Sequence, residues 1–226
     1  MLLLALSCLQ GRPMQAAAEE LLALGPEGLQ LTPGNAPTGG FEAWLAQRGV
    51  ETRTHHGFHW RALRSPVWSS EAECLVGSHS VHPPREQEDA AARWFHRAGQ
   101  GAFADRTVET MYPGYVLGTG EELERAMELG LRLAVDVSHL CIQREAGVLA
   151  ERTWKRLQDY PRIGEVHVSE SLGQRDAHRP VHPATFGLGW VKERLGAGVD
   201  VILECYMHRL SPRERLEQLD ILRGNE

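Results

Sequence analysis

The chain has 226 residues, 42% of them hydrophobic, and a formal net charge of −6 at pH 7, which is an ordinary globular composition. The chain has no surplus of basic residues that would bind a phosphate backbone non-specifically, and no apolar run reaches the roughly 18 residues of a membrane span. The four cysteines are widely spaced without a C-x-x-C motif, as expected for reduced thiols in a cytoplasmic protein: Cys8, Cys74, Cys141 and Cys205.

Residues 1–8 form an apolar stretch that superficially resembles a signal or lipoprotein sequence. The stretch has no positively charged start, and its apolar run is short for a secretory signal. We therefore expect a first buried strand here.

Strand-like and helix-like segments alternate along the chain. Strand-like segments, the most apolar of them at the N-terminus and over 131–139, are predicted over 2–7, 28–32, 50–56, 74–79, 107–111, 131–139, 164–169 and 199–204. Helical periodicity and capping signals predict helices over 14–24, 41–48, 87–97, 119–130, 147–159, 183–195 and 211–224. The segment 59–70 lacks periodicity and contains Pro66, so the third strand has no regular helical partner.

This order amounts to eight βα units with no break in composition. It predicts a single (β/α)8 TIM barrel over residues 1–226. A doubly wound open sheet is the alternative. No glycine-rich dinucleotide or phosphate loop follows the first strand, which counts against that alternative.

The segment Leu131–His139 ends in an acid and an imidazole. Its apolar residues predict a parallel strand covered on both faces, with Asp136 and His139 at the C-terminal mouth. Chemistry is placed at that end of parallel α/β sheets. An Asp-x-x-His pair there can give one oxygen and one nitrogen to a divalent metal.

Other expected strands end in the same way. The acidic and imidazole groups at or after strand ends are His55, His56, His79, His82, Glu109, Asp136, His139, His167, Asp176, His178 and Glu204. In a barrel these ends converge on one face. Carboxylates packed that closely would repel one another, and divalent cations remove the repulsion. The mixture of carboxylates and imidazoles without cysteine favours Zn, Mn or Fe over Ca.

With these residues the sequence resembles the xylose isomerase-like TIM barrels, and within them endonuclease IV. Glu109 matches that family's fifth-strand glutamate, and Asp136 and His139 match its Asp-x-x-His. The remaining matches are His167, the Asp-x-His of Asp176 and His178, the last-strand Glu204, and the two earlier ligands His56 and His82, for which His55 and His79 compete. The resemblance implies two or three bound ions, zinc favoured, with Glu109 bridging two of them.

The chain departs from endonuclease IV in being shorter and acidic, with short loops and no basic stripe. We therefore expect no tight binding to duplex DNA. The favoured function is metal-assisted hydrolysis of a phosphoester or other small-molecule substrate, with Glu109, Glu204 and His139 as catalytic residues. Arg175 and Arg179 flank the Asp-x-His segment and are expected to hold a substrate anion.

Three other functions stay open. A sugar isomerase or epimerase would hold one Mn, Co or Zn with Glu109, Asp136, His167 and Glu204 and shuttle a proton between carboxylates. Residues 176–181 are similar to a segment of the multinuclear non-haem iron oxidative enzymes, so an enzyme of that kind acting on a peptide is the second. The Asp-x-Asn-Asn that is usual in that family is replaced here by Asp-Val-Ser-His at 136–139. A non-catalytic sugar-binding barrel is the third. In each case Trp60 is expected to form a substrate wall.

Overall fold

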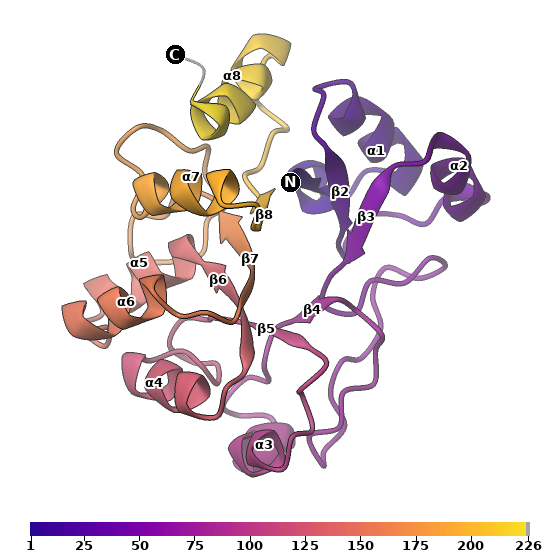
Figure 1. Ribbon diagram of the computed structural model, residues 1–226. Coiled ribbons are helices and arrows are strands. Elements are labelled where there is room, and N and C mark those ends of the chain that lie inside the picture. The colour runs from indigo at the N-terminus through magenta and orange to yellow at the C-terminus, as the bar shows by residue number, and fades with distance from the viewer. Residues whose placement is uncertain (225–226) are drawn as a thin grey trace.

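The strands form one parallel sheet that curls into a ring with the helices outside it (Figure 1). A computed structural model of the chain describes residues 1–224. The strands are β1 (Leu2–Ala5), β2 (Gly28–Leu31), β3 (Glu51–Thr54), β4 (Ser80–Val81), β5 (Thr107–Glu109), β6 (Arg132–Asp136), β7 (Ile163–Val168) and β8 (Asp200–Leu203). Their order in the sheet is β3-β2-β1-β8-β7-β6-β5-β4.

The ring closes between β3 and β4. His55 pairs with Ser80 in an isolated parallel bridge. On either side of it, the His79 amide donates to the Thr54 carbonyl and the His56 amide to the Ser80 carbonyl, each at 2.9 Å. The predicted (β/α)8 barrel is therefore confirmed, and the open doubly wound sheet is wrong.

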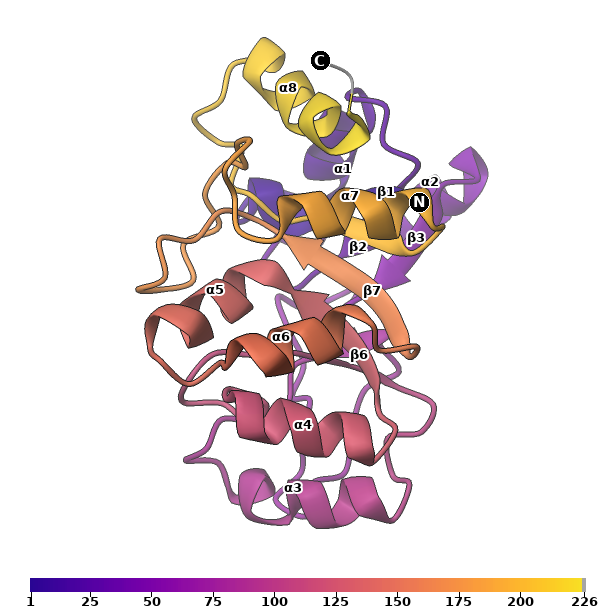
Figure 2. The same cartoon turned by 60° about the vertical axis from the view of Figure 1, so that its left-hand side comes forward.

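Helices cover the outside of the ring. They are α1 (Met14–Leu22), α2 (Phe41–Arg48), α3 (Asp89–Gly99), α4 (Gly120–Glu128), α5 (Val137–Glu145), α6 (Glu151–Gln158), α7 (Leu188–Gly196) and α8 (Pro212–Arg223). Figure 2 shows α3, α4, α6 and α7 side by side along the flank of the barrel. Both predicted capping boxes are present, at Thr119 for α4 and at Ser211 for α8. Within residues 1–224 none of the helices combines the length and apolarity needed to cross a membrane.

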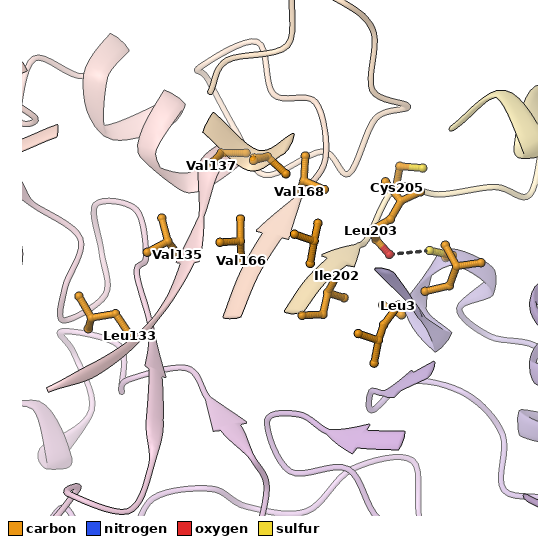
Figure 3. Close-up of a cluster of buried hydrophobic side chains, with 14 of the residues drawn as sticks. Leu3, Leu133, Val135, Val137, Val166, Val168, Ile202, Leu203 and Cys205 are labelled. Atoms are coloured by element: carbon orange, nitrogen blue, oxygen red, sulfur yellow. Dashed lines mark hydrogen bonds between the residues drawn. The ribbon is translucent and has the colours of Figure 1, made fainter. Parts of the chain in front are cut away.

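The strand residues alternate between the helix layer and the barrel interior. Val166 and Val168 of β7 face outward into an apolar layer that Figure 3 shows together with Leu133 and Val135. Glu165 and His167 face inward, because successive side chains of a strand point to opposite faces. Inward positions of neighbouring strands are in register, since Asp136 pairs with His167. The apolar layer stabilises the barrel, and the interior is left free for polar side chains.

The first strand was predicted correctly. β1 lies between β2 and β8, and its four residues are buried. A short 3₁₀ turn over Leu6–Leu9 follows it. The Cys8 thiol of that turn donates to the Leu203 carbonyl at 3.2 Å, which ties the turn to β8 (Figure 3).

Three predicted elements are misplaced. The fourth strand, expected over 74–79, is the two-residue β4 further along, because the apolar Leu75 that suggested the strand is 55% exposed on an irregular loop. The helix expected over 147–159 corresponds to α6, and an additional helix that was not predicted, α5, precedes it and starts directly at the end of β6. α7 begins at Leu188 rather than 183, after Gly187, whose φ of 72° is a left-handed conformation suited to glycine.

Candidate metal centre

The inward-facing residues at the C-terminal ends of β3 to β8 surround a small cavity, which we call the central cavity. Its volume is about 110 Å³, close to that of a few water molecules. The residues that line it are Ser7, Thr32, Pro33, His55, His56, His82, Glu109, His139, Asp176, His178 and Glu204. Most of the predicted site residues therefore meet at one place.

Glu109, the last residue of β5, lies at the centre of the cluster. Its Oε2 is 3.1 Å from His167 Nδ1, and 3.4 Å from both His55 Nε2 and His82 Nε2. Its Oε1 is 3.3 Å from His139 Nδ1. One carboxylate thus contacts imidazoles from four segments of the barrel, as a bridging ligand would have to do.

The Asp-x-x-His pair owes its geometry to a helix start. Asp136 is the N-cap of α5, and its Oδ1 accepts the amides of Ser138 at 2.6 Å and His139 at 3.1 Å. His139 Nδ1 lies 2.8 Å from the Thr110 carbonyl and donates to it. This bond leaves His139 Nε2 without a proton in the neutral ring, and that nitrogen faces Asp176 Oδ2 at 3.4 Å.

The loop after β7 brings the Asp-x-His segment to the same cavity. Asp176 Oδ2 lies 3.1 Å from His178 Nε2, and His178 Nδ1 lies 4.0 Å from Glu204 Oε2. Backbone hydrogen bonds between Glu170 and Arg179, at 2.9 and 3.2 Å, close the base of the loop. His178 has a φ of 43°, an uncommon conformation for a residue other than glycine, which the closed loop holds in place.

The four histidines that follow β3 or lie around β4, and that compete for two ligand positions, point in different directions. His55 Nε2 faces His82 Nε2 at 2.9 Å and Glu109. His56 also lines the central cavity, but its ring stacks on His82 at 3.9 Å and its Nδ1 accepts the His82 amide. His79 is exposed, and its Nδ1 accepts the Thr54 amide. The geometry therefore favours His55 and His82 as the pair that faces Glu109, with His56 behind His82.

The carboxylates and imidazoles shift one another's proton affinity. Burial lowers the pKa of His167 and His139, but the surrounding carboxylates outweigh it, and both pKa values lie well above the usual range. Asp176 and Glu204 likewise outweigh burial at His178 and raise its pKa to about 9. Burial raises the pKa of Glu204 to about 7. Burial and the neighbouring His82 lower the pKa of His56 to about 2.

The residues around the central cavity fit divalent metal ions. Several buried atoms that face it have no hydrogen-bond partner among the described residues: Glu109 Oε2, His139 Nε2, His167 Nδ1, Asp176 Oδ1 and His178 Nδ1. Atoms that bind one ion at about 2.0–2.2 Å are roughly 2.9–3.5 Å apart, which is the range of most separations given above. Three overlapping groups each offer ligand atoms that all lie within 4.8 Å of one another: His55, Glu109 and His167; Glu109, Asp136 and His139; and Asp136, His167 and Glu204.

The residues expected to bind substrate lie outside this cluster. Arg175 is exposed and lines a separate cleft beside Asp176. Arg179 is exposed at the base of the same loop. Trp60 packs on Phe41 and Phe58 and lines a pocket near the start of α2 rather than the central cavity.

Two buried polar residues, one below the cavity and one in its wall, were not predicted from the sequence. Glu165 on β7 is fully buried, and its Oε1 lies 2.9 Å from His167 Nε2. The signal for it was its spacing, since a residue two before His167 on a strand points to the same face. Thr32 at the end of β2 lines the cavity with a buried hydroxyl that has no partner among the described residues.

Comparisons with known proteins bear on the fold. No family model matches the chain, and none of the curated proteins searched matches it. Among solved structures it is similar to a D-tagatose 3-epimerase-like protein, with a TM-score of 0.67 and 13% identity over 99% of this chain and 96% of the other. It is also similar to 3-keto-D-glucoside 4-epimerase from E. coli, with a TM-score of 0.55 and 15% identity over 95% and 98%. The chain therefore has the (β/α)8 TIM-barrel fold predicted from its sequence, which these solved structures share.

Proposed function

We propose that the protein is a metal-dependent enzyme that hydrolyses a small phosphoester with two or more divalent ions at the central cavity. The observation that carries this proposal is the position of Asp176 and His178. Asp176 Oδ2 lies within 3.4 Å of both His139 Nε2 and His178 Nε2. Asp176 and His178 thus place further possible ligand atoms next to His139, beside the compact groups that contain Glu109, and a single ion would not need them.

The bound ions would activate a water molecule and neutralise the phosphoryl oxygens. His55, His82, His167 and Glu109 would hold one part of the metal site, and Asp136, His139, Asp176 and His178 the other. Glu204 contacts both parts, through His167 Nδ1 at 3.4 Å and His178 Nδ1 at 4.0 Å. A carboxylate at this position can accept a proton from the attacking water, so Glu204 is suited to act as the general base.

The size of the cavity bears on which part of the substrate it receives. A volume of about 110 Å³ holds a phosphoryl group or a few carbon atoms, and the rest of a larger substrate would extend out of its open mouth. Thr32 and Ser7, from the ends of β2 and β1, form the wall that carries no titratable group. The unpartnered Thr32 hydroxyl is placed to bind a substrate oxygen there. Arg175 in the adjoining cleft would pair with a second anionic group of the substrate.

The second candidate is a sugar isomerase or epimerase. The observation that favours it is the pair of glutamates on either side of one imidazole: His167 Nδ1 lies 3.1 Å from Glu109 and 3.4 Å from Glu204. With Asp136, these residues complete a ring able to hold one ion, and two carboxylates can pass a proton between neighbouring carbons. Both structural neighbours described above carry epimerase names.

Elemental analysis of protein purified without added metal separates these functions. Two or more zinc or manganese ions per chain, together with hydrolysis of a chromogenic phosphodiester or phosphomonoester, would support the hydrolase. One ion per chain with epimerisation of a free ketose would overturn it in favour of the isomerase. Two or more irons would point to oxidative chemistry, and a metal-free protein that binds sugars without turnover would reject an enzyme altogether.

A further inference from the structure

We propose that Glu165 is a positioning residue that fixes the orientation and the proton-bearing nitrogen of two imidazoles at the metal centre, those of His167 and His55. The inference rests on the proposed metal-binding function and adds a residue one layer below it. Glu165 does not line the central cavity. Its carboxylate lies inside the barrel, fully buried, on the side of the two imidazoles away from the cavity.

The first contact is with His167. Glu165 Oε1 lies 2.9 Å from His167 Nε2, and both side chains are fully buried. Gln30 Nε2 also lies 3.2 Å from this nitrogen, but the carboxylate is nearer and can only accept, so the Nε2–H of His167 donates to Glu165. His167 Nδ1 is then the nitrogen left to face Glu109 and Glu204. Glu165 therefore selects Nδ1 as the ligand atom of His167.

The second contact runs through Ser80. His55 Nδ1 lies 2.9 Å from Ser80 Oγ, and Ser80 is close enough to Glu165 to lower the pKa of that carboxyl group. A Ser80 hydroxyl that donates toward the carboxylate would leave its Oγ to accept from the Nδ1–H of His55. His55 Nε2 then faces Glu109 and His82 without a proton. One carboxylate thus sets opposite ring nitrogens of two histidines toward the same cavity.

A buried carboxylate needs a counter-charge, and Arg53 supplies it. Arg53 Nε donates to Glu165 Oε2 at 2.9 Å, and its Nη1 donates to Asp200 Oδ2 at 2.6 Å. Asp200 is also 3.2 Å from the N-terminal ammonium. This chain of charges keeps Glu165 as an acceptor in the barrel interior. Outer partners of metal-bound histidines of this kind hold the ring in place and raise its basicity.

The test compares Glu165→Ala and Glu165→Gln with Asp200→Asn as the matched control. Asp200→Asn removes a charge from the same network without touching either histidine. We expect zinc affinity, measured by competition with a chelator, to fall about 10–100-fold in Glu165→Ala. The fall should be smaller in Glu165→Gln, whose amide oxygen still accepts a hydrogen bond, and smallest in Asp200→Asn. Wild-type affinity in both Glu165 variants would overturn the proposal.

A second readout does not depend on metal. In ¹⁵N-histidine-labelled, metal-free wild type, the Nε2–H proton of His167 should be visible and protected from exchange, and it should be absent from His167→Gln. Its loss in Glu165→Ala, with far-UV circular dichroism unchanged, supports the positioning role. Its persistence overturns that role. If the wild type binds no zinc, the proposed function fails, while this proton still decides whether Glu165 holds the His167 ring. If Glu165→Ala does not fold, Glu165→Gln carries both measurements.

Discussion

His55 Nε2 and His82 Nε2 face each other at 2.9 Å inside the barrel, and each is 3.4 Å from the same oxygen of Glu109. Two imidazole nitrogens at this distance share either a proton or a metal ion, since two N–H groups pointing at each other would repel. The third atom of the triangle is a carboxylate oxygen. A divalent ion bound by these two nitrogens and the carboxylate oxygen would give all three atoms a partner, whereas a single shared proton would leave one of them without a partner.

This relationship predicts which of two adjacent histidines binds metal. Replacing His55 by Ala should remove one nitrogen ligand and lower the metal content or affinity at this part of the site. Replacing His56 by Ala should have a smaller effect, because His56 stacks on His82 and binds its amide rather than facing Glu109. Native mass spectrometry and chelator competition on both variants measure this difference. A greater loss in His56→Ala would return the assignment to His56.

Glu109 gives a second prediction. Its carboxylate contacts four imidazoles, so it belongs to more than one of the compact ligand groups. Glu109→Gln keeps the shape and removes the charge, and we expect the bound metal to fall and activity to be lost. Glu128→Gln, an exposed glutamate on α4, is the control. Unchanged stoichiometry by native mass spectrometry would show that Glu109 is not a ligand.

Much of the site could be predicted from the sequence because strand ends converge. Glu109, Asp136, His167 and Glu204 each lie at or near the end of a predicted strand, and the two-residue period of a strand fixes their inward direction. His139 followed from its spacing to Asp136, although the helix that places it at the cavity was not foreseen. That helix starts without a loop, because Asp136 ends β6 and caps α5 at once.

The remaining parts of the site depend on structural features that the pattern of apolar and polar residues in the sequence does not contain. β4 has only two residues, so no apolar run marks it, and the neighbouring His79 and His82 could not be placed on faces. His55 and His56 are adjacent, and their different directions follow from a left-handed turn at His56, with a φ of 36°. Glu165 was overlooked because its partners, Arg53 and Ser80, come from distant strands that meet only when the barrel closes.

The negative net charge of the protein predicts weak binding to nucleic acid. With a net charge of −6, the protein lacks the release of counterions that drives non-specific DNA binding. We expect no binding to a duplex containing an abasic site at micromolar protein and physiological salt, as measured by fluorescence anisotropy. A submicromolar, salt-sensitive dissociation constant would restore a DNA-repair role. An undamaged duplex of the same sequence is the control for specificity.

The His178–Asp176 pair predicts a pH dependence of stability in the metal-free protein. The pKa of His178 is raised from 6.5 to about 9 in the folded state, so its stabilising effect is complete below pH 6.5 and is lost as pH rises through 9. The pKa of Asp176 is lowered, so its effect is present above its ordinary value of 3.8 and is lost as pH falls. Between these limits the pair contributes up to about 3 kcal/mol.

The measurement is urea unfolding in EDTA at pH 6 and pH 9.5. The difference in unfolding free energy between wild type and His178→Ala should shrink at the higher pH. His59→Ala, which replaces an exposed histidine away from the cavity, should show no such change. An equal difference at both pH values would mean that His178 does not carry the predicted charge.

The last prediction separates a one-ion site from a site with two or more. Asp176 Oδ2 lies 3.1 Å from His178 Nε2 and 3.4 Å from His139 Nε2, so the proposed second ion would use Asp176 and His178 as ligands. In Asp176→Ala/His178→Ala we expect a drop of about one metal ion per chain, because the group around Glu109 keeps its own ligands. Activity should be lost as well, since a two-metal clamp then stabilises only one side of the transferring group. Arg175→Ala, next to the pair in sequence but directed to the adjoining cleft, should keep the full metal content. If the double variant retains every ion and folds normally by circular dichroism, Asp176 and His178 are not ligands. In that case the ring of Glu109, Asp136, His167 and Glu204 is the whole metal site, and a sugar isomerase becomes the better description of this barrel.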